Sequence, residues 1–202
     1  MFKPINKSCA RRILNLPEDC KVVLFGALGG SRDPRKGYDL LLDALNALAD
    51  NSSNWYGVVF GERCPQHSPI SGLPMQWLGH VHDDYTLAIL YSAVDVMVVP
   101  SRQENLPQTA TEAQSCGTPV VGFNAGGMSD AVVHGETGYL AEPFSSDDLA
   151  DGIKWVLTDD ARYASLCAAA RRRAVRLWSP EVILPKYIDV YRQAIEFHQS
   201  KQ

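Results

Sequence analysis

Short apolar stretches alternate with longer amphipathic ones along most of the chain. The short stretches are rich in β-branched and aromatic residues, a pattern typical of buried strands. They are VVLFG from Val22, YGVVF from Tyr56, MQWLG from Met75, DVMVVP from Asp95 and PVVGF from Pro119. The amphipathic stretches predict helices. In the clearest of them, KGYDLLLDALNALA over 36–49, apolar side chains recur at helical spacing at Tyr38, Leu41, Leu42, Leu45 and Leu48.

Further helices are predicted over 84–93, 108–116, 147–157, 161–176 and 180–197. Strands that alternate with helices predict a parallel sheet, because parallel neighbours need crossover connections. We therefore predict an α/β fold with a doubly wound, Rossmann-like parallel sheet covered by helices on both faces. Residues 1–202 are expected to form a single domain, with a connection and a short helix in 1–20 and a C-terminal helix in 180–197.

In such sheets, ligands bind beyond the carboxyl ends of the strands. The segments to inspect therefore follow Gly26, Phe60, Gly79, Pro100 and Phe123.

Composition and charge narrow the classes of function. The 202 residues are 46% hydrophobic, enough for one sizeable core, and the net charge of −4 argues against a general binder of nucleic acid. The five cysteines form no C-x-x-C pair, which argues against a disulfide framework or a zinc knuckle and favours a reducing, cytoplasmic setting. The start of the chain lacks the apolar core of a signal peptide, and no apolar run reaches the roughly 20 residues of a membrane-spanning helix.

The loop after the first predicted strand, GALGGSRDPRKG, combines glycines with basic residues ahead of a helix. Asp33 can cap that helix and Pro34 suits its first turn, so the loop leads into a helix N-terminus, which attracts anions. Arg32 and Lys36 are then candidate phosphate ligands. The loop matches neither the nicotinamide-binding G-x-G-x-x-G pattern nor the P-loop. A solvated turn with surface charges explains this loop equally well.

A second candidate site lies in PSRQENLPQTATEAQSCGTPVV, which starts at Pro100. If a strand ends there and a helix begins with Pro107 as its first residue, Leu106 offers no side-chain oxygen to cap that helix. The amides of Gln108 and Thr109 are then left open. Open amides at the ligand-binding edge of a parallel sheet suit a diphosphate.

The same stretch holds Glu104 and Glu112, eight positions apart. Eight residues of helix span about 12 Å, so these carboxylates are not predicted to share a proton. Each ionised carboxylate accepts hydrogen bonds and therefore favours hydroxyl groups. A nucleotide-sugar offers sugar hydroxyls at one end and ribose hydroxyls at the other, with a diphosphate between them. The alternative is that Glu104 is a solvated loop charge and Glu112 a polar helix position.

Several other features have more than one interpretation. Gly126 and Gly127, in FNAGGMSDAVVHGETGYL, allow either close approach of backbone to a ligand or a positive φ at a turn. His80 and His82 are interpreted as part of a turn rather than a metal site, and the chain contains no Asp-x-Asp. The basic run RRRAVR over 171–176 fits either peripheral contact with an anionic membrane or, as we favour, a solvated helix face.

Over nearly its whole length, the chain resembles the carboxyl-terminal half of retaining glycosyltransferases of family 4, which have the GT-B fold. Four motifs carry the resemblance. The first is KG at Lys36–Gly37, and the second is the pattern of Glu104, seven residues and Glu112. The GG at Gly126–Gly127 and the TGYL over 137–140 follow in the expected order.

The resemblance implies the donor-binding domain of a retaining glycosyltransferase that transfers a sugar from a nucleotide-diphosphate sugar to a glycan or lipid-linked acceptor in surface polysaccharide biosynthesis. It implies that Lys36 binds the diphosphate, that Glu104 contacts the transferred sugar as the catalytic residue, and that Glu112 binds the ribose. The remaining donor-binding positions are expected to be Arg32, Asn105, Leu106, Gln108, Thr109, Gly126 and Gly127. No metal ion or other cofactor is implied.

The resemblance also implies a partner. The amino-terminal, acceptor-binding domain of such enzymes is absent from these 202 residues, so the chain is expected to be an inactive fragment, located in the cytoplasm or peripherally at the inner membrane face. Two departures from the family pattern are Ala27, where an arginine is common, and Pro107, where a glycine is common. Arg32 is the candidate replacement for the missing arginine. The competing functions are half of a sucrose- or trehalose-type synthase and a non-catalytic nucleotide-binding module.

Overall fold

The computed structural model describes residues 1–202 except 27–28, 30–31, 50–53, 65–71 and 202. Within these residues, a six-stranded parallel sheet has the strand order β3-β2-β1-β4-β5-β6. The strands are β1 (Lys21–Gly26), β2 (Trp55–Phe60), β3 (Met75–Trp77), β4 (Val96–Val99), β5 (Val120–Phe123) and β6 (Gly138–Ala141). The predicted doubly wound parallel sheet is confirmed.

Strand β6 was not predicted from the sequence as a strand. It has only four residues and pairs with one neighbour, β5, along the edge of the sheet. Its two central residues, Tyr139 and Leu140, are half-buried, so the segment lacks the continuous apolar run that marks the central strands.

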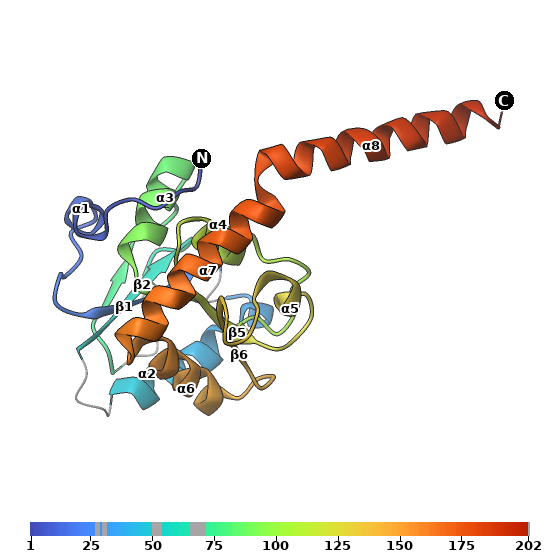
Figure 1. Cartoon of the computed structure of the whole chain (residues 1–202). Coiled ribbons are helices and arrows are strands. Elements are labelled where there is room, and N and C mark those ends of the chain that lie inside the picture. Colours follow the sequence, from blue (N-terminus) through green and yellow to red (C-terminus); the bar gives the residue numbers. More distant parts are fainter. Residues whose placement is uncertain (27–28, 30–31, 50–53, 65–71, 202) are drawn as a thin grey trace.

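Helices cover both faces of the sheet (Figure 1). They are α1 (Lys7–Ile13), α2 (Tyr38–Ala49), α3 (Asp84–Ala93), α4 (Gln108–Ser115), α5 (Met128–Ala131), α6 (Ser146–Leu157), α7 (Asp160–Trp178) and α8 (Pro180–Gln199), with a 3-10 turn, η1 (Pro34–Lys36). The predicted helices are confirmed, with two differences. Helix α2 begins at Tyr38 rather than at Lys36, because Gly37 adopts a left-handed φ of 66°. The one-turn helix α5 was not predicted.

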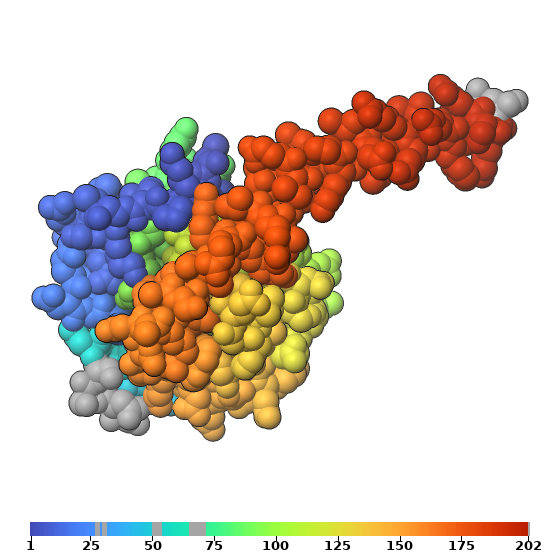
Figure 2. Space-filling model, viewed as in Figure 1, coloured from blue at the N-terminus to red at the C-terminus, as the bar shows by residue number. Residues whose placement is uncertain are grey.

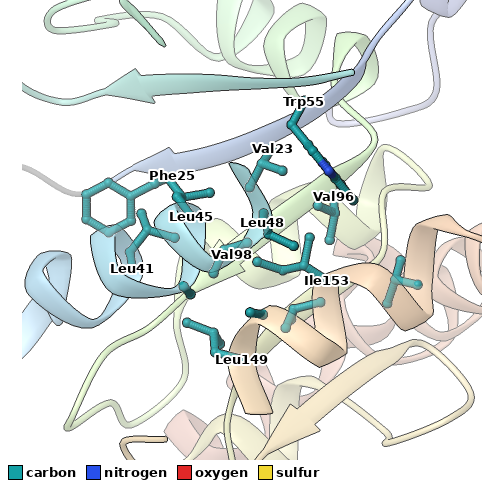
Figure 3. Close-up of a cluster of buried hydrophobic side chains, with 14 of the residues drawn as sticks. Val23, Phe25, Leu41, Leu45, Leu48, Trp55, Val96, Val98, Leu149 and Ile153 are labelled. Atoms are coloured by element: carbon teal, nitrogen blue, oxygen red, sulfur yellow. The ribbon is translucent and has the colours of Figure 1, made fainter. Parts of the chain in front are cut away.

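Two apolar layers form the core, one on each face of the sheet. Alternation along β1 sends Val23 and Phe25 to one layer and Val22 and Leu24 to the other. Figure 3 shows the first layer, in which α2 and α6 lie together against the strands. Its labelled side chains are Val23, Phe25, Leu41, Leu45, Leu48, Trp55, Val96, Val98, Leu149 and Ile153. Burial on both faces explains why the central strands read as unbroken apolar runs.

A buried ion pair closes the amino-terminal end of the sheet. Asp95, just before β4, accepts from the Arg11 guanidinium at 2.6 Å, from Lys7 Nζ at 2.7 Å and from the backbone N–H of Val22 at 2.7 Å. The Arg11 side chain is only 5% exposed, and it also donates to the carbonyl of Ala93 at 2.9 Å. These contacts attach α1 to β1 and β4 at the end opposite the predicted ligand edge.

Helix α8 extends away from the rest of the molecule (Figures 1 and 2). The proline at 180 disfavours a helical backbone at Ser179, which is extended at ψ 150° and separates α7 from α8. No residue of α8 is buried. Its exposed large apolar side chains are Leu184, Tyr187, Ile188, Val190, Tyr191, Ile195 and Phe197. Among the described helices, none combines the length and apolarity that crossing a bilayer requires.

Candidate functional site

A pocket of about 370 Å³ opens at the carboxyl ends of β1 and β4. These two strands are neighbours at the point where the strand order reverses, so the connections that follow them diverge and leave a crevice. The pocket lining includes Phe25, Gly26, Lys36, Val98, Val99, Pro100, Ser101, Glu104, Leu106, Pro107, Gln108 and Thr109. Both sequence segments with candidate chemistry therefore meet here. A smaller hollow of about 240 Å³ shares Lys36 and Glu104 and adds Asn105.

A larger hollow, of about 610 Å³, lies at the opposite end of the sheet. Its lining includes Arg11, Cys20 and Asp95, and none of the predicted site residues. The charges of Arg11 and Asp95 already neutralise one another at 2.6 Å. We therefore place the candidate site in the pocket at the carboxyl edge, where charged groups and open amides converge.

Lys36 and Glu104 form an ion pair in that pocket. Lys36 Nζ lies 2.6 Å from Glu104 Oε1, and the two side chains are 30% and 15% exposed. The sequence suggested each residue as a ligand group but gave no sign that they pair with each other. In this structure, the basic group and the carboxylate therefore satisfy one another.

Helix α4 begins with two open amides beside this ion pair. Pro107 is the N-cap, with an extended ψ of 117°, and not the first helical residue as predicted. Its side chain provides no capping oxygen, and its carbonyl accepts from the amides of Ala110 and Thr111. Within the part of the chain that the structure describes, the amides of Gln108 and Thr109 have no protein acceptor. They are available to an anion at the positive end of the helix.

Glu112 lies further along α4 and does not line the pocket. The buried hydroxyl of Tyr91 donates to Glu112 Oε2 at 2.9 Å. Burial raises the pKa of the Glu112 carboxyl, with Asp84 adding to the rise and the Tyr91 hydrogen bond opposing it. Burial, together with the nearby Glu112 charge, also raises the pKa of Tyr91, so the phenol stays protonated and remains a donor. Glu104 and Glu112 thus contact different partners.

Gly126 and Gly127 support the loop that carries Glu104. The N–H of Gly127 donates to the Glu104 carbonyl at 2.7 Å. A Cβ at Gly127 would overlap the Asn105 carbonyl oxygen, and one at Gly126, whose φ is 56°, would overlap the Glu104 carbonyl oxygen. The close approach that these glycines permit is therefore to the chain's own backbone, and their predicted contact with a donor remains a prediction.

Arg102 is a site-forming residue that the sequence analysis missed. Its guanidinium forms a two-hydrogen-bond ion pair with Asp39, at 2.9 and 2.6 Å, and also donates to the Pro34 carbonyl at 2.7 Å. The backbone N–H of Arg102 donates to the Arg35 carbonyl at 2.7 Å. An isolated arginine in a loop carries no pattern that would reveal such contacts.

Other predicted residues lie away from the pocket. Arg32 is 84% exposed and lies 3.2 Å from Glu62, outside the pocket lining, while Ala27 lies outside the described residues. Asp33 caps as expected, but the element it caps is η1 rather than α2. The rings of His80 and His82 are 6.0 Å apart. The described residues contain no group of three or more His, Cys, Asp or Glu side chains able to hold a metal ion.

Two arginines of the basic run over 171–176 donate hydrogen bonds to backbone carbonyls of the chain. Arg171 donates to the carbonyl of Phe2 at 3.1 Å, and Arg173 donates to the carbonyl of Asp130 at 2.7 Å. Arg172 and Arg176 are exposed. Half of the arginines in this run are thus engaged with the chain's own backbone.

Residues 7–173 match the family described as glycosyl transferases group 1. The chain belongs to this family. It is 32% identical to the D-inositol 3-phosphate glycosyltransferase of Thermobispora bispora, over 97% of this chain and 48% of that protein. This glycosyl transferases group 1 chain spans about half the length of the curated relatives it matches.

Solved structures place the group 1 chain among GT-B glycosyltransferases. Sucrose-phosphate synthase from Thermosynechococcus elongatus has a TM-score of 0.81 at 31% identity, covering 96% of this chain and 50% of that one. The Anabaena protein HepE, solved in complex with UDP-glucose, has a TM-score of 0.79 at 24% identity, covering 95% of this chain and 54% of that one.

Substituting Gly127 in the group 1 chain tests the backbone contact behind Glu104. We expect Gly127→Ala to lower the free energy of unfolding by about 1–3 kcal/mol, the usual effect of overpacking, and to shift the amide NMR signals of Glu104 and Asn105. The φ of Gly127 is −82°, which an alanine adopts without strain, so the destabilisation is expected from the overlap of the new Cβ with the Asn105 carbonyl alone. Gly135→Ala is the control, because its φ of 76° brings strain of about 1–2 kcal/mol with no atom nearby. Equal shifts of the Glu104 signal in both variants would contradict the contact.

The raised pKa of Glu112 predicts a pH-dependent stability. The folded chain binds this proton more tightly than the unfolded chain does, so ionised Glu112 costs stability at neutral pH, and the cost disappears as pH falls through the folded pKa towards 4.5. We expect Glu112→Gln to raise the melting temperature at pH 7, with the difference from wild type shrinking near pH 4.5. Glu136→Gln, at an exposed position, serves as the control. A lower melting temperature for Glu112→Gln at pH 7 would refute the inference that ionised Glu112 destabilises the folded chain.

Proposed function

We propose that this chain is the donor-binding half of a retaining, family 4 glycosyltransferase and binds a nucleotide-diphosphate sugar at the carboxyl edge of its sheet. One observation carries the proposal. Lys36 Nζ, the Glu104 carboxylate and the open amides at the start of α4 line the same pocket. A cation and open helix amides suit a diphosphate, and a carboxylate suits sugar hydroxyls.

In this proposal, the donor replaces the contact between Lys36 and Glu104. The diphosphate accepts hydrogen bonds from Lys36 and from the amides of Gln108 and Thr109. Glu104, released from Lys36, accepts hydrogen bonds from the transferred sugar near the reacting carbon. As the sugar departs, negative charge grows on the diphosphate, where Lys36 and the positive end of α4 stabilise it without a metal ion. Glu112 accepts from the ribose hydroxyls.

The acceptor, in this proposal, is bound by a second domain that precedes this chain. The relatives are about twice as long. The first residues of the chain lie against α7, where Arg171 donates to the Phe2 carbonyl. The exposed apolar side chains of α8 are a surface that such a domain could cover. We further propose that the complete enzyme acts in the cytoplasm, in polysaccharide biosynthesis.

A second candidate, supported by the similarity to sucrose-phosphate synthase, is half of a sucrose- or trehalose-type synthase. The donor half is the same in both candidates, and the acceptor distinguishes them. A non-catalytic nucleotide-binding module is the remaining alternative. It predicts that Glu104→Gln has no effect on activity once the second domain is present, whereas the glycosyltransferase requires a loss.

Calorimetry with UDP, GDP and ADP tests the donor site. We expect at least one nucleoside diphosphate to bind, and to raise the melting temperature, since a ligand at 100 times its dissociation constant adds about 2.7 kcal/mol of stability. Turnover by this chain alone is expected to be absent. If none of the three binds at millimolar concentration, the donor site is wrong.

The ribose assignment has its own test. Glu112→Ala is expected to weaken nucleotide binding by about 1.5–3 kcal/mol, the range for hydrogen bonds to a charged group. The loss should be the same for a nucleoside diphosphate and its sugar derivative, because both contain the ribose. Glu136→Ala, at an exposed position, serves as the control. Unchanged affinity in the Glu112 variant would contradict the assignment.

A further inference from the structure

Arg102 joins the two loops that form the pocket. It lies in the β4–α4 loop, two positions before Glu104, and its contacts reach both sides of Lys36. Towards the N-terminus it bonds the carbonyls of Pro34 and Arg35, each at 2.7 Å. Towards the C-terminus its guanidinium grips the Asp39 carboxylate, in the first turn of α2, at 2.9 and 2.6 Å.

Arg102 itself does not line either hollow of the site. Its side chain is 34% exposed and that of Asp39 is 64% exposed, so the ion pair contributes little to global stability. These contacts instead fix positions. A planar guanidinium that donates two hydrogen bonds to a carboxylate and a third to a carbonyl holds these partners in a defined relative position. The segment that it fixes is the one from which Lys36 extends.

Backbone packing gives the same segment a second attachment. A Cβ at Gly37 would overlap the Pro100 carbonyl oxygen, so the two loops touch directly beside Lys36. Lys36 and Glu104 are 68 residues apart in sequence, yet their charged atoms lie 2.6 Å apart. The Arg102 hydrogen bonds and the contact between Gly37 and Pro100 therefore hold the two loops together close to this ion pair.

We propose that Arg102 is a positioning residue that holds Lys36 beside Glu104 and the open amides of α4, and thereby sets the affinity of the site for a diphosphate. The effect on affinity rests on the proposed donor-binding function, but the effect on the Lys36–Glu104 pair does not. A preorganised site binds more tightly because less ordering is needed when the ligand arrives. Arg102 acts through Lys36 and is not assigned a contact with the ligand.

A ligand-free test measures whether Lys36 and Glu104 interact only when Arg102 is present. Melting temperatures are determined for Lys36→Met, Glu104→Gln and the double variant, first with Arg102 and then with Arg102→Ala. We expect non-additive shifts with Arg102 in place and additive shifts without it. Coupling that persists in Arg102→Ala, or that is absent from the parent chain, overturns the proposal. Asp39→Asn provides a milder variant that should weaken the coupling in the same way if Arg102→Ala does not fold.

A binding test then uses UDP, GDP, ADP and inorganic pyrophosphate as probes. We expect Arg102→Ala to weaken the probes that bind by tenfold or more, including pyrophosphate, and Arg102→Lys to restore part of the affinity. Arg162→Ala is the matched control, because Arg162 also grips a carbonyl, that of Trp155 at 2.7 Å, and packs on the Trp155 ring, far from the site. It should lower the melting temperature without changing affinity.

The outcomes separate the two proposals. If no probe binds the parent chain, the donor site fails, and the positioning role of Arg102 is decided by the coupling measurement alone. If probes bind the parent chain and Arg102→Ala with equal affinity, the donor site stands and the positioning role is refuted. An equal loss of affinity in Arg162→Ala would show a general effect of stability and would also refute it.

Discussion

Close backbone contact on both sides of the β4–α4 loop is the constraint on which the site depends. On one side, Gly37 lies against the Pro100 carbonyl, and on the other, Gly126 and Gly127 lie against the carbonyls of Glu104 and Asn105. Any side chain at these glycines would occupy the space of a carbonyl oxygen. The loop is therefore held by the two neighbouring connections of the sheet, and the direction in which Glu104 leaves it is set by packing.

The sheet topology explains why this loop receives support from both sides. Strand β4 lies between β1 and β5, so its carboxyl end is flanked by the connections that follow both neighbours. The connection after β1 supplies Lys36 and Gly37, and the connection after β5 supplies Gly126 and Gly127. At the opposite end, the buried pair of Arg11 and Asp95 fixes where β4 begins. Strand β4 is thus fixed at its amino end, and the candidate site lies at its carboxyl end.

Local patterns account for what the sequence could predict. Continuous apolar runs revealed the central strands because these are buried on both faces, and the spacing of the apolar residues revealed the buried face of α2. The long-range polar contacts were not predictable. Lys36 and Glu104 are 68 positions apart, and Arg11 and Asp95 are 84 apart. No periodicity links such pairs, so the ion pairs and the Arg102 contacts appear only in the folded chain.

The stability of the fold does not explain why position 112 carries a glutamate. A neutral glutamine could accept the same hydrogen bond from Tyr91, and it would carry no charge for burial to destabilise, unlike the ionised carboxyl whose pKa burial raises. Packing of α4 on α3 therefore does not require a charge at this position. A half-buried carboxylate that the fold does not need is the kind of local inconsistency expected at functional sites. The proposed role of Glu112 in ligand binding thus has physical support that does not depend on its spacing from Glu104.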